Sequence, residues 1–468
     1  MQYPKQQEHA MADAQAMTTT NTLPHATLLE SLKVFAQVLG PTWAKGVIIR
    51  RPAMVGIAES LGLDKHAVRY MQKLRDKYGN DPLLLRLPKS INYALVFMPE
   101  HVHRVLQETH QPFATDSREK HAALAHFQPH GVLISQDPER SKRRHFNEAV
   151  LDTALPVHRL ADHFMGVIHE EASQLLNSLG YKQQLDWERF AISWFRIVRR
   201  VVFGNAARDD EQLTQLVNKL RGHANWAFMH PKNDKLQQQL HSRINHYIQL
   251  AAQSGSAPEP SLAALIASTP QDADTAPADQ VAHWLFAFDP AGMTVFRALA
   301  LLASHPQQAA QAQTELKANT GSSRQYLPYL RACILEALRL WPTTPVILRQ
   351  SKTATQWDSG MMPTNTGLII YTPLLHRDDE NLSYANTFAP EVWLDQQHTT
   401  TAQQWPLLPF SDGPAVCPAR NLVLLLTSNM LAQLLESGAL ELRSSRLSPK
   451  LPLPGTLSPY RLRFKVKG

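Results

Sequence analysis

The spacing of apolar and polar residues predicts a chain that is mainly helical from about residue 25 onward. Apolar residues recur at intervals of three and four through most of the sequence, which is the period of an amphipathic helix. The main early exception is 81–98, where β-branched and aromatic residues lie between turn-forming residues and predict short strands. Residues 1–24 are polar and without periodicity, and we expect them to be disordered. The pattern predicts a mainly α fold with a small β-rich region.

Two later segments show most clearly where a loop and a helix begin and end. Residues 253–280 are rich in Ser, Pro and Asp and predict a loop that flanks one short helix. A long apolar helix is expected from Val281 to Ser304, interrupted only at Pro290, because His305 and Pro306 then stop it. We find no internal repeat, and we expect residues 25–468 to form a single domain.

Composition places the chain among globular proteins of a reducing compartment. The 468 residues are 44% hydrophobic and 19% charged, which is enough apolar material for a large core. Two cysteines, Cys333 and Cys417, are too few for a disulfide framework, so a cytoplasmic location is expected. Neither a signal peptide nor a transmembrane anchor is predicted, and contact of residues 28–61 with a membrane surface stays open.

The charge of the chain favours acidic partners. Lys and Arg number 47 and Asp and Glu number 40, which gives a net charge of +7. The basic cluster 140–144 (RSKRR) is suited to steering such a partner. Nucleic acid is not expected as the partner, because the sequence shows no groove-reading module or pattern of stacking aromatic residues.

The segment that carries the most chemistry is the loop that ends at Cys417. It runs from Phe410 to Arg420 (FSDGPAVCPAR) and directly precedes the apolar run 421–426. A thiolate on a Gly- and Pro-containing loop, with a helix beginning behind it, suits an axial ligand of haem iron. The alternative is a small buried hydrophobic residue, so other motifs must decide.

A second pattern is the pair Glu336 and Arg339, about eighty residues before Cys417. The two residues share one face of a predicted helix whose other residues are mostly apolar. A buried pair of this kind needs further hydrogen-bond partners. The alternative is an ion pair on the surface.

With these motifs the sequence resembles the cytochrome P450 family of haem-thiolate monooxygenases, as a soluble, bacterial-type member. Phe410, Gly413 and Cys417 match the family's haem-binding segment, and Glu336 and Arg339 match its ExxR motif. The segment 388–393 (FAPEVW) matches the Phe-x-Pro-Glu-Arg segment between them, in the family's order and spacing. The resemblance implies a triangular-prism fold, mainly α with a small β-rich side.

The resemblance also implies roles for residues around a haem b. Cys417 would be the proximal ligand, with Phe410 packed near the sulfur. The haem propionates would be bound by arginines at positions that match the family's cationic positions: Arg140, Arg144 and Arg349.

Several residues depart from the family pattern near these motifs. Ser411 and Ala419 replace glycines, and Ala415 replaces a basic residue. Val392 stands where an arginine usually completes the network around Glu336 and Arg339. We therefore expect another partner for that pair, with His376 as the candidate.

The largest departure lies in the long helix, at the position where the family activates oxygen. Alignment of the helix end places Asp289 and Pro290 where an acid and a threonine are usual. Pro290 has no hydroxyl group and leaves the carbonyl of Phe286 without a helical donor, so a bound water is expected to relay protons there. An alternative register makes Thr294 the nearest hydroxyl group.

Function follows from the resemblance in outline. Phe286, Ala287, Val346 and Ile347 would face the substrate, and all four are apolar, which predicts a lipophilic small molecule. Electrons would come from a ferredoxin- or flavodoxin-type donor. The predicted activity is oxygen insertion. The alternatives are a peroxide-using or otherwise atypical member that performs oxidative coupling or desaturation, and a haem-binding protein with little turnover.

Overall fold

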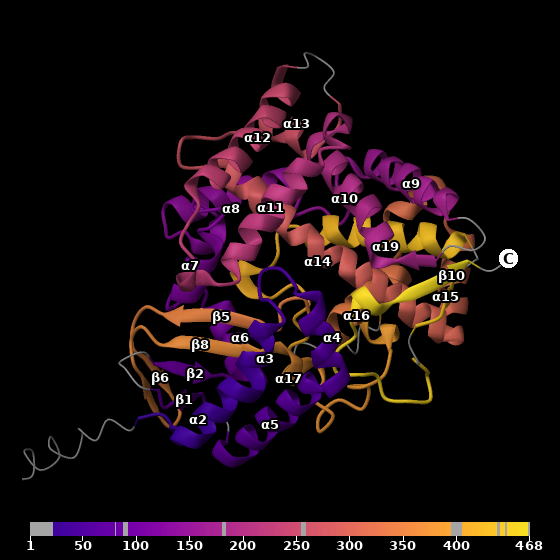
Figure 1. Ribbon diagram of the computed structural model, residues 1–468. Helices are drawn as coiled ribbons and strands as arrows, with labels where there is room; N and C mark the ends of the chain where they lie inside the picture. Colours follow the sequence, from indigo (N-terminus) through magenta and orange to yellow (C-terminus); the bar gives the residue numbers. More distant parts are fainter. Residues whose placement is uncertain are drawn as a thin grey trace, which may run out of the picture.

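A computed structural model describes residues 22–79, 81–87, 92–179, 184–253, 259–394, 405–437, 440–444 and 447–466. Helices dominate it, with one mixed sheet at the lower left of the view in Figure 1. The helices on the side of the sheet are α2 (Leu28–Val34), α3 (Gly40–Ala44), α4 (Pro52–Leu61), α5 (Leu63–Tyr78), α6 (Pro99–Gln107), α7 (Arg118–Leu124) and α17 (Thr372–His376). The others are α8 (Glu139–Val150), α9 (Ala161–Ser178), α10 (Trp187–Phe203), α11 (Glu211–Ala224), α12 (Asp234–Gln253), α13 (Leu262–Ser268), α14 (Pro277–Ser304), α15 (Pro306–Ala318), α16 (Pro328–Leu340) and α19 (Arg420–Glu436). The mainly α prediction is confirmed.

The five-stranded sheet has the order β1-β2-β8-β5-β3. Its strands are β1 (Leu83–Leu85), β2 (Tyr93–Leu95), β8 (Gly367–Tyr371), β5 (Val346–Ser351) and β3 (Phe113–Ala114). β2 and β8 run parallel and the other neighbours antiparallel, with Val346 opposite Tyr371 at the end of β5 nearest α16. The central strands are apolar because both faces of the sheet are covered.

Two smaller sheets lie elsewhere on the molecule. β4 (Gln184–Asp186), β10 (Arg463–Val466) and β9 (Leu440–Leu442) form one, in the order β4-β10-β9. β6 (Thr355–Trp357) and β7 (Gly360–Met362) form an antiparallel hairpin. The strands predicted within 81–98 correspond to β1 and β2, which pair with Leu83 opposite Leu95.

Helix α14 crosses the middle of the molecule and packs against α10, α12, α16 and α19 (Figure 1). It begins at Pro277, four residues before the predicted start, because proline suits the first helical turn. Pro290 does not interrupt it, contrary to the sequence expectation. The lost helical hydrogen bond is tolerated because the helix on both sides of Pro290 is held by buried packing.

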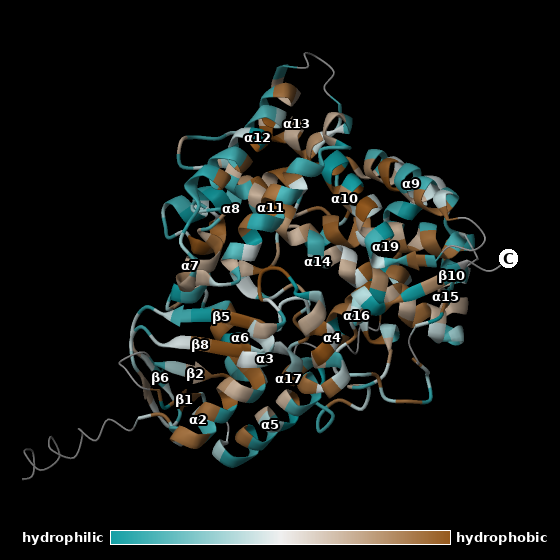
Figure 2. Cartoon of the chain, viewed as in Figure 1, coloured by the Kyte–Doolittle hydropathy of each residue, from teal (hydrophilic) through white to brown (hydrophobic). Residues whose placement is uncertain are grey.

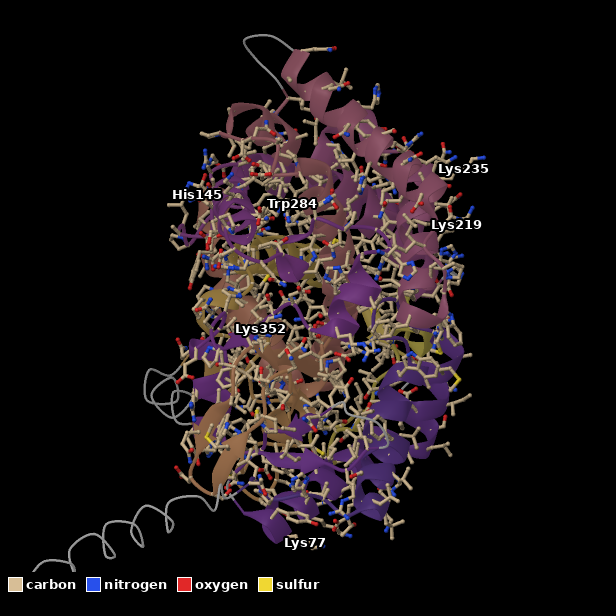
Figure 3. All side chains as sticks on the ribbon, turned by 90° about the vertical axis from the view of Figure 1, so that its left-hand side faces the viewer. Lys77, His145, Lys219, Lys235, Trp284 and Lys352 are labelled. Carbon is tan, nitrogen blue, oxygen red and sulfur yellow. The ribbon has the colours of Figure 1, made fainter. Side chains whose placement is uncertain are left out.

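The interior is apolar and the charged residues are mostly peripheral. Figure 2 shows hydrophobic residues gathered where the central helices meet, and Figure 3 shows Lys77, Lys219 and Lys235 at the edge of the molecule, whereas Trp284 is only 3% exposed. By length and composition α14 could cross a membrane, but 83% of its most apolar window is buried within the fold. That burial is typical of a core helix.

Two predictions touch segments that are only partly described. Of residues 1–24, which were predicted to be disordered, residues 1–21 lie outside the described residues, and Leu23 is buried. The predicted loop 253–280 contains α13, its one short helix, while 254–258 lie outside the described residues.

Candidate active site

The loop before α19 places the sulfur of Cys417 at the wall of a cavity. The Cys417 N–H donates to the carbonyl of Phe410 at 3.0 Å, which folds the loop back on itself, and α19 begins three residues later. Gly413 has φ +66°, and a Cβ there would lie 2.2 Å from the carbonyl oxygen of Leu106 in α6. Only glycine therefore allows the loop to lie this close to α6. Ser411 adopts φ +64° where the family has glycine, so the loop keeps its shape at some steric cost.

The cavity has a volume of about 280 Å³ and lies between α14, the sheet strand β5 and the Cys417 loop. Most of the predicted site residues line it together. They are Cys417, Phe410, Arg140, Arg144, Arg349, Phe286, Ala287, Pro290, Val346 and Ile347. Gly413 and Asp289 are not in its wall. Residues up to 277 positions apart in the sequence thus meet at one cavity, although their roles stay predictions.

The electrostatic setting of Cys417 differs from that of the other cysteine. Burial raises the pKa of the Cys417 thiol, whereas a backbone hydrogen bond at Ala419 and the charges of Arg144 and Arg420 lower it. Cys333 is fully buried in α16, and burial together with nearby carboxylates raises its pKa strongly. Cys417 is the cysteine that faces a cavity with cations beside it, which is the setting for a thiolate ligand.

Three arginines line the cavity with donors to spare. Arg140 pairs with Asp137 at 3.0 Å, and Arg144 donates to Glu148 at 2.6 Å and to the carbonyl of Val416 at 2.8 Å. Arg349 donates to Thr109 Oγ1 at 2.9 Å and to the Leu348 carbonyl at 3.0 Å. Among the described residues, each guanidinium keeps one terminal nitrogen without an acceptor. These nitrogens are Arg140 Nη1, Arg144 Nη2 and Arg349 Nη2. Such a set suits an anionic group in the cavity.

His110 and Ser411 add buried polar atoms that the sequence reasoning missed. The Nε2 of His110 and the Oγ of Ser411 have no hydrogen-bond partner among the described residues, and both residues line the cavity. Burial, together with Arg140, Arg349 and Arg144, lowers the pKa of His110 to about 4. A neutral His110 can therefore donate to an anion beside the arginines. No motif surrounds His110, so the sequence held no signal for it.

The pair Glu336 and Arg339 is fully buried and fully satisfied. The two side chains have 0% exposure and lie 2.6 Å apart. Glu336 also accepts from the indole N–H of Trp393 and from the Ala389 N–H, each at 2.9 Å. The guanidinium of Arg339 donates to backbone carbonyls of His376, Tyr384, Ala385 and Thr387.

His376 is a partner of the pair, as expected, but through its backbone and not its imidazole. His376 contacts Arg339 through its backbone carbonyl at 2.6 Å, while its imidazole Nε2 accepts from the Leu408 N–H at 2.8 Å. The side chain that completes the network is Trp393, one residue after the position where the family has arginine. The sequence offered Trp393 as a candidate for this role. An indole N–H can donate a hydrogen bond to a carboxylate, as the missing arginine would, although it carries no charge.

On the opposite side of the cavity, Asp289 points away from it. Its carboxylate pairs with Arg221 of α11 at 2.6 Å, and both side chains are almost completely buried. Pro290, Ala291 and Thr294 face the cavity instead. The Thr294 hydroxyl donates to the Pro290 carbonyl at 3.0 Å. The side chain of Thr294, which the alternative register proposed, is therefore nearer to the cavity than the carboxylate.

Two further polar residues lie in the part of the cavity lined by the predicted substrate residues. Lys120 donates to the Leu348 carbonyl at 3.2 Å, and burial together with Arg349 lowers its pKa to about 7. The Nδ1 of His283 is buried without a partner among the described residues, and burial together with Lys120 lowers its pKa to about 4. Sequence reasoning missed both residues, since neither belongs to a motif.

Comparison with known proteins gives a family match over most of the chain. The model of the family described as Cytochrome P450 matches residues 50–464. Two crystal structures, of a cytochrome P450 and of the cytochrome P450DA haem domain, are similar in fold. Each has a TM-score of 0.68 and covers 86% of this chain, with 94% and 92% of the other chain and identities of 18% and 16%.

Curated relatives match over shorter segments. The chain is 30% identical to cytochrome P450 98A8 of Arabidopsis thaliana over 155 residues, which are 31% of each chain. It is 33% identical to ferruginol synthase of Salvia miltiorrhiza over 129 residues, 26% of each. It is 34% identical to flavonoid-6-hydroxylase of Mentha piperita over 150 residues, 30% of this chain and 29% of that protein. The matched segments thus span about a third or less of the length of these relatives.

Proposed function

The chain belongs to the cytochrome P450 family, and on that premise we propose that it is a monooxygenase that inserts one oxygen atom from O2 into a lipophilic small molecule. The observation that carries the proposal is the single cavity that joins Cys417, three arginines with unused donors and the apolar wall of α14. A thiol in the wall and cations beside it match the two things a haem requires, a ligand for the iron and partners for the propionates.

The residues present fit haem b. Cys417 would bind the iron through its sulfur, and Arg140, Arg144 and Arg349 would donate to the propionates, with His110 Nε2 as a neutral fourth donor. When bound, the haem would supply the activation of oxygen. Phe410 lies in the same wall as the sulfur and would limit its contact with water. The protein's own part is to hold, orient and shield these groups.

Proton delivery would follow an atypical plan in α14. The carbonyl of Phe286 lacks its helical donor because Pro290 has no N–H, so it can hold a water beside the cavity. Thr294 Oγ1 faces the same cavity and can accept from that water, since its own proton goes to the Pro290 carbonyl. Asp289 lies behind this wall with Arg221 and would supply protons only through an intermediate carrier.

The substrate would be a lipophilic molecule that carries a polar group. The apolar wall is formed by Phe286, Ala287, Val346 and Ile347. His283 Nδ1 has no protein partner, and Lys120 Nζ makes one of the three hydrogen bonds open to it. The relative named flavonoid-6-hydroxylase supports hydroxylation as the reaction class.

Electrons would come from a ferredoxin- or flavodoxin-type donor in the cytoplasm of a bacterial-type host. The cluster 140–144 offers less free charge than its sequence indicates, because Lys142 pairs with Asp272 and Asp274, and Arg140 pairs with Asp137. Arg420, exposed at the start of α19 and three residues from Cys417, is the cation better placed to meet an acidic donor.

The test is to follow labelled oxygen. The haem-loaded protein would be supplied with a surrogate ferredoxin chain, NADPH and ¹⁸O2, with a flavonoid and a terpenoid panel as substrates. We expect one ¹⁸O atom per hydroxylated product and substrate-dependent NADPH consumption. Product formed only with hydrogen peroxide would replace this function by the peroxide-using one, and no product with any oxidant would leave a haem-binding protein.

A further inference from the structure

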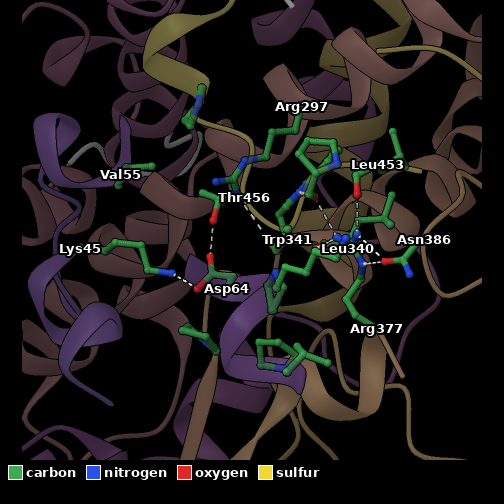
Figure 4. Close-up of a pocket in the computed structure, with 18 of the residues that line it drawn as sticks. Lys45, Val55, Asp64, Arg297, Leu340, Trp341, Arg377, Asn386, Leu453 and Thr456 are labelled. Carbon is green, nitrogen blue, oxygen red and sulfur yellow. Dashed lines mark hydrogen bonds and ion pairs between the residues drawn. The ribbon is translucent and has the colours of Figure 1, made fainter. Parts of the chain in front are cut away.

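A second cavity of about 440 Å³, shown in Figure 4, is lined by α14 residues other than those that line the Cys417 cavity. It lies between α4, α5, the second half of α14 and the C-terminal segment 452–460, and it opens to solvent beside Lys65 and Arg69. Met293 lines this cavity and Thr294 lines the other, and Pro342 and Pro345 alternate in the same way with Thr343 and Thr344. The two cavities therefore share a wall and do not share their lining.

Part of the charge in this cavity is paired within the protein. Lys45 forms an ion pair with Asp64, whose other oxygen accepts from Thr456 (Figure 4). Arg377 is occupied by the side-chain oxygen of Asn386 and by the carbonyls of Leu340, Leu453 and Pro454. These groups hold the C-terminal segment against the fold and leave little capacity for a ligand.

Arg297 differs from them because its guanidinium is buried and only partly used. The residue is 7% exposed. Its Nε donates to the Leu457 carbonyl at 2.9 Å and its Nη1 to the Trp341 carbonyl at 3.2 Å. Among the described residues no acceptor binds Nη2, and no carboxylate pairs with Arg297.

Arg50 adds a second cation beside it, half-buried and with both terminal nitrogens in use. It donates to the carbonyls of Gly46 and Thr343, and no described carboxylate forms an ion pair with it. Burial, followed by the charge of Arg50, lowers the pKa of Arg297 to about 10, so the two guanidinium groups act on each other. Asp64 acts on both arginines across the cavity, but its two oxygens are already bound to Lys45 and Thr456, so an anion that binds Arg297 directly would add stabilisation.

The remaining wall includes Lys65 and the Arg69–Asp379 ion pair, but a large part of it is apolar. The apolar part includes Val55, Met293, Leu340, Trp341 and Tyr460. We propose that this cavity binds an organic monocarboxylate with an apolar body, held through its carboxylate by Arg297 Nη2 and Arg50. The planar guanidinium favours a carboxylate, and the apolar wall accommodates the hydrocarbon part. This binding would not depend on turnover at the Cys417 cavity.

The test is calorimetric titration of the full-length, haem-loaded protein with decanoate, with 1-decanol as the uncharged control. We expect decanoate to bind with one-site stoichiometry and 1-decanol to bind at least about tenfold more weakly, because a charge-assisted hydrogen bond is lost. Equal affinity of the two compounds would overturn the proposal.

Three variants assign the binding to one cavity. Arg297→Gln is expected to weaken decanoate binding at least about tenfold. Because that change also alters contacts to Leu457 and Trp341, Val55→Phe provides a second test, since it fills the cavity without removing a charge. Val346→Phe, in the Cys417 cavity, is the matched control and should leave decanoate affinity unchanged. Binding that survives Val55→Phe but is lost in Val346→Phe would place decanoate in the other cavity and contradict the proposal.

Discussion

Two buried ion pairs lie on opposite sides of the Cys417 cavity, and they are built differently. Glu336 and Arg339 have no exposed surface, and their polar atoms meet two N–H donors and four backbone carbonyls. Asp289 receives a single hydrogen bond, from Arg221, and the Nε of Arg221 has no partner among the described residues. The hydrogen-bonding groups of Glu336 and Arg339 are thus all used, whereas Arg221 keeps a donor without an acceptor.

The difference indicates that the Glu336–Arg339 pair has a structural role, whereas the surroundings of Asp289 and Pro290 can vary. The first pair fixes the segment that leads to the Cys417 loop, and where a family residue is missing, Trp393 takes over its hydrogen bond. In α14, Pro290 removes a helical N–H, and the nearest hydroxyl is that of Thr294, one turn further along the helix. On the side of Cys417, Trp393 thus replaces a missing hydrogen-bond donor and the network is kept. On the side of α14, the polar groups differ from those that the family usually has.

Breaking the Glu336–Arg339 pair should have the largest effect on stability. Glu336→Gln leaves Arg339 as an uncompensated buried cation, and we expect a loss of about 3–5 kcal/mol in the free energy of unfolding. Urea titration of the haem-loaded protein measures it. Asp379→Asn breaks the exposed pair with Arg69 and is the control, with an expected loss below about 1 kcal/mol. An equal loss of unfolding free energy in Glu336→Gln and Asp379→Asn would contradict the structural role of the buried pair.

Acid should weaken the same region through His376. Burial, together with Arg339, lowers the pKa of His376 to about 3. The unfolded chain therefore takes up this proton below about pH 6.5 while the folded protein does not, so stability falls as pH decreases. Between pH 7.5 and pH 5 the wild type should lose about 2 kcal/mol more than His376→Gln, whose side-chain oxygen can still accept from Leu408. If the free energy of unfolding falls by the same amount between the two pH values in the wild type and in His376→Gln, the prediction is refuted.

Removing the substitute donor should cost less. Trp393→Phe deletes the N–H that Glu336 accepts, and a loss of about 1.5–2 kcal/mol is expected because the acceptor is charged. Trp226→Phe is the matched control, since Trp226 is 42% exposed, and its loss should stay within about 0.5 kcal/mol. If both variants unfold at the same urea concentration, Trp393 does not complete the network.

Breaking the Asp289–Arg221 pair should affect catalysis more than substrate binding. Asp289→Asn leaves Arg221, 2% exposed, with only neutral acceptors, so a loss of about 3 kcal/mol is expected, at the lower end of the range for a broken buried pair. Oxygen-dependent turnover should fall about tenfold or more, while the substrate affinity from spin-state titration stays within about twofold. An equal loss of affinity and turnover would make Asp289 a structural residue.

The sequence was sufficient to predict features that depend on local patterns. It was insufficient to predict the directions in which side chains point. The helical class, the strands near residues 83–95 and the position of Cys417 all follow from local patterns. The turn of Asp289 toward Arg221, 68 positions away, depends on how α11 packs against α14. His110, Lys120 and His283 reach the cavity from segments without motifs. Tertiary contacts of this kind leave no periodic trace.

The most direct test of the account is the spectrum of the reduced, haem-loaded protein with carbon monoxide. Thiolate ligation by Cys417 predicts the red-shifted Soret band in the wild type and in Cys333→Ser, because Cys333 is buried away from the cavity. The band should be absent from Cys417→Ser. A band that persists in Cys417→Ser, or one that is missing from the wild type, would contradict the assignment of this sulfur as the ligand.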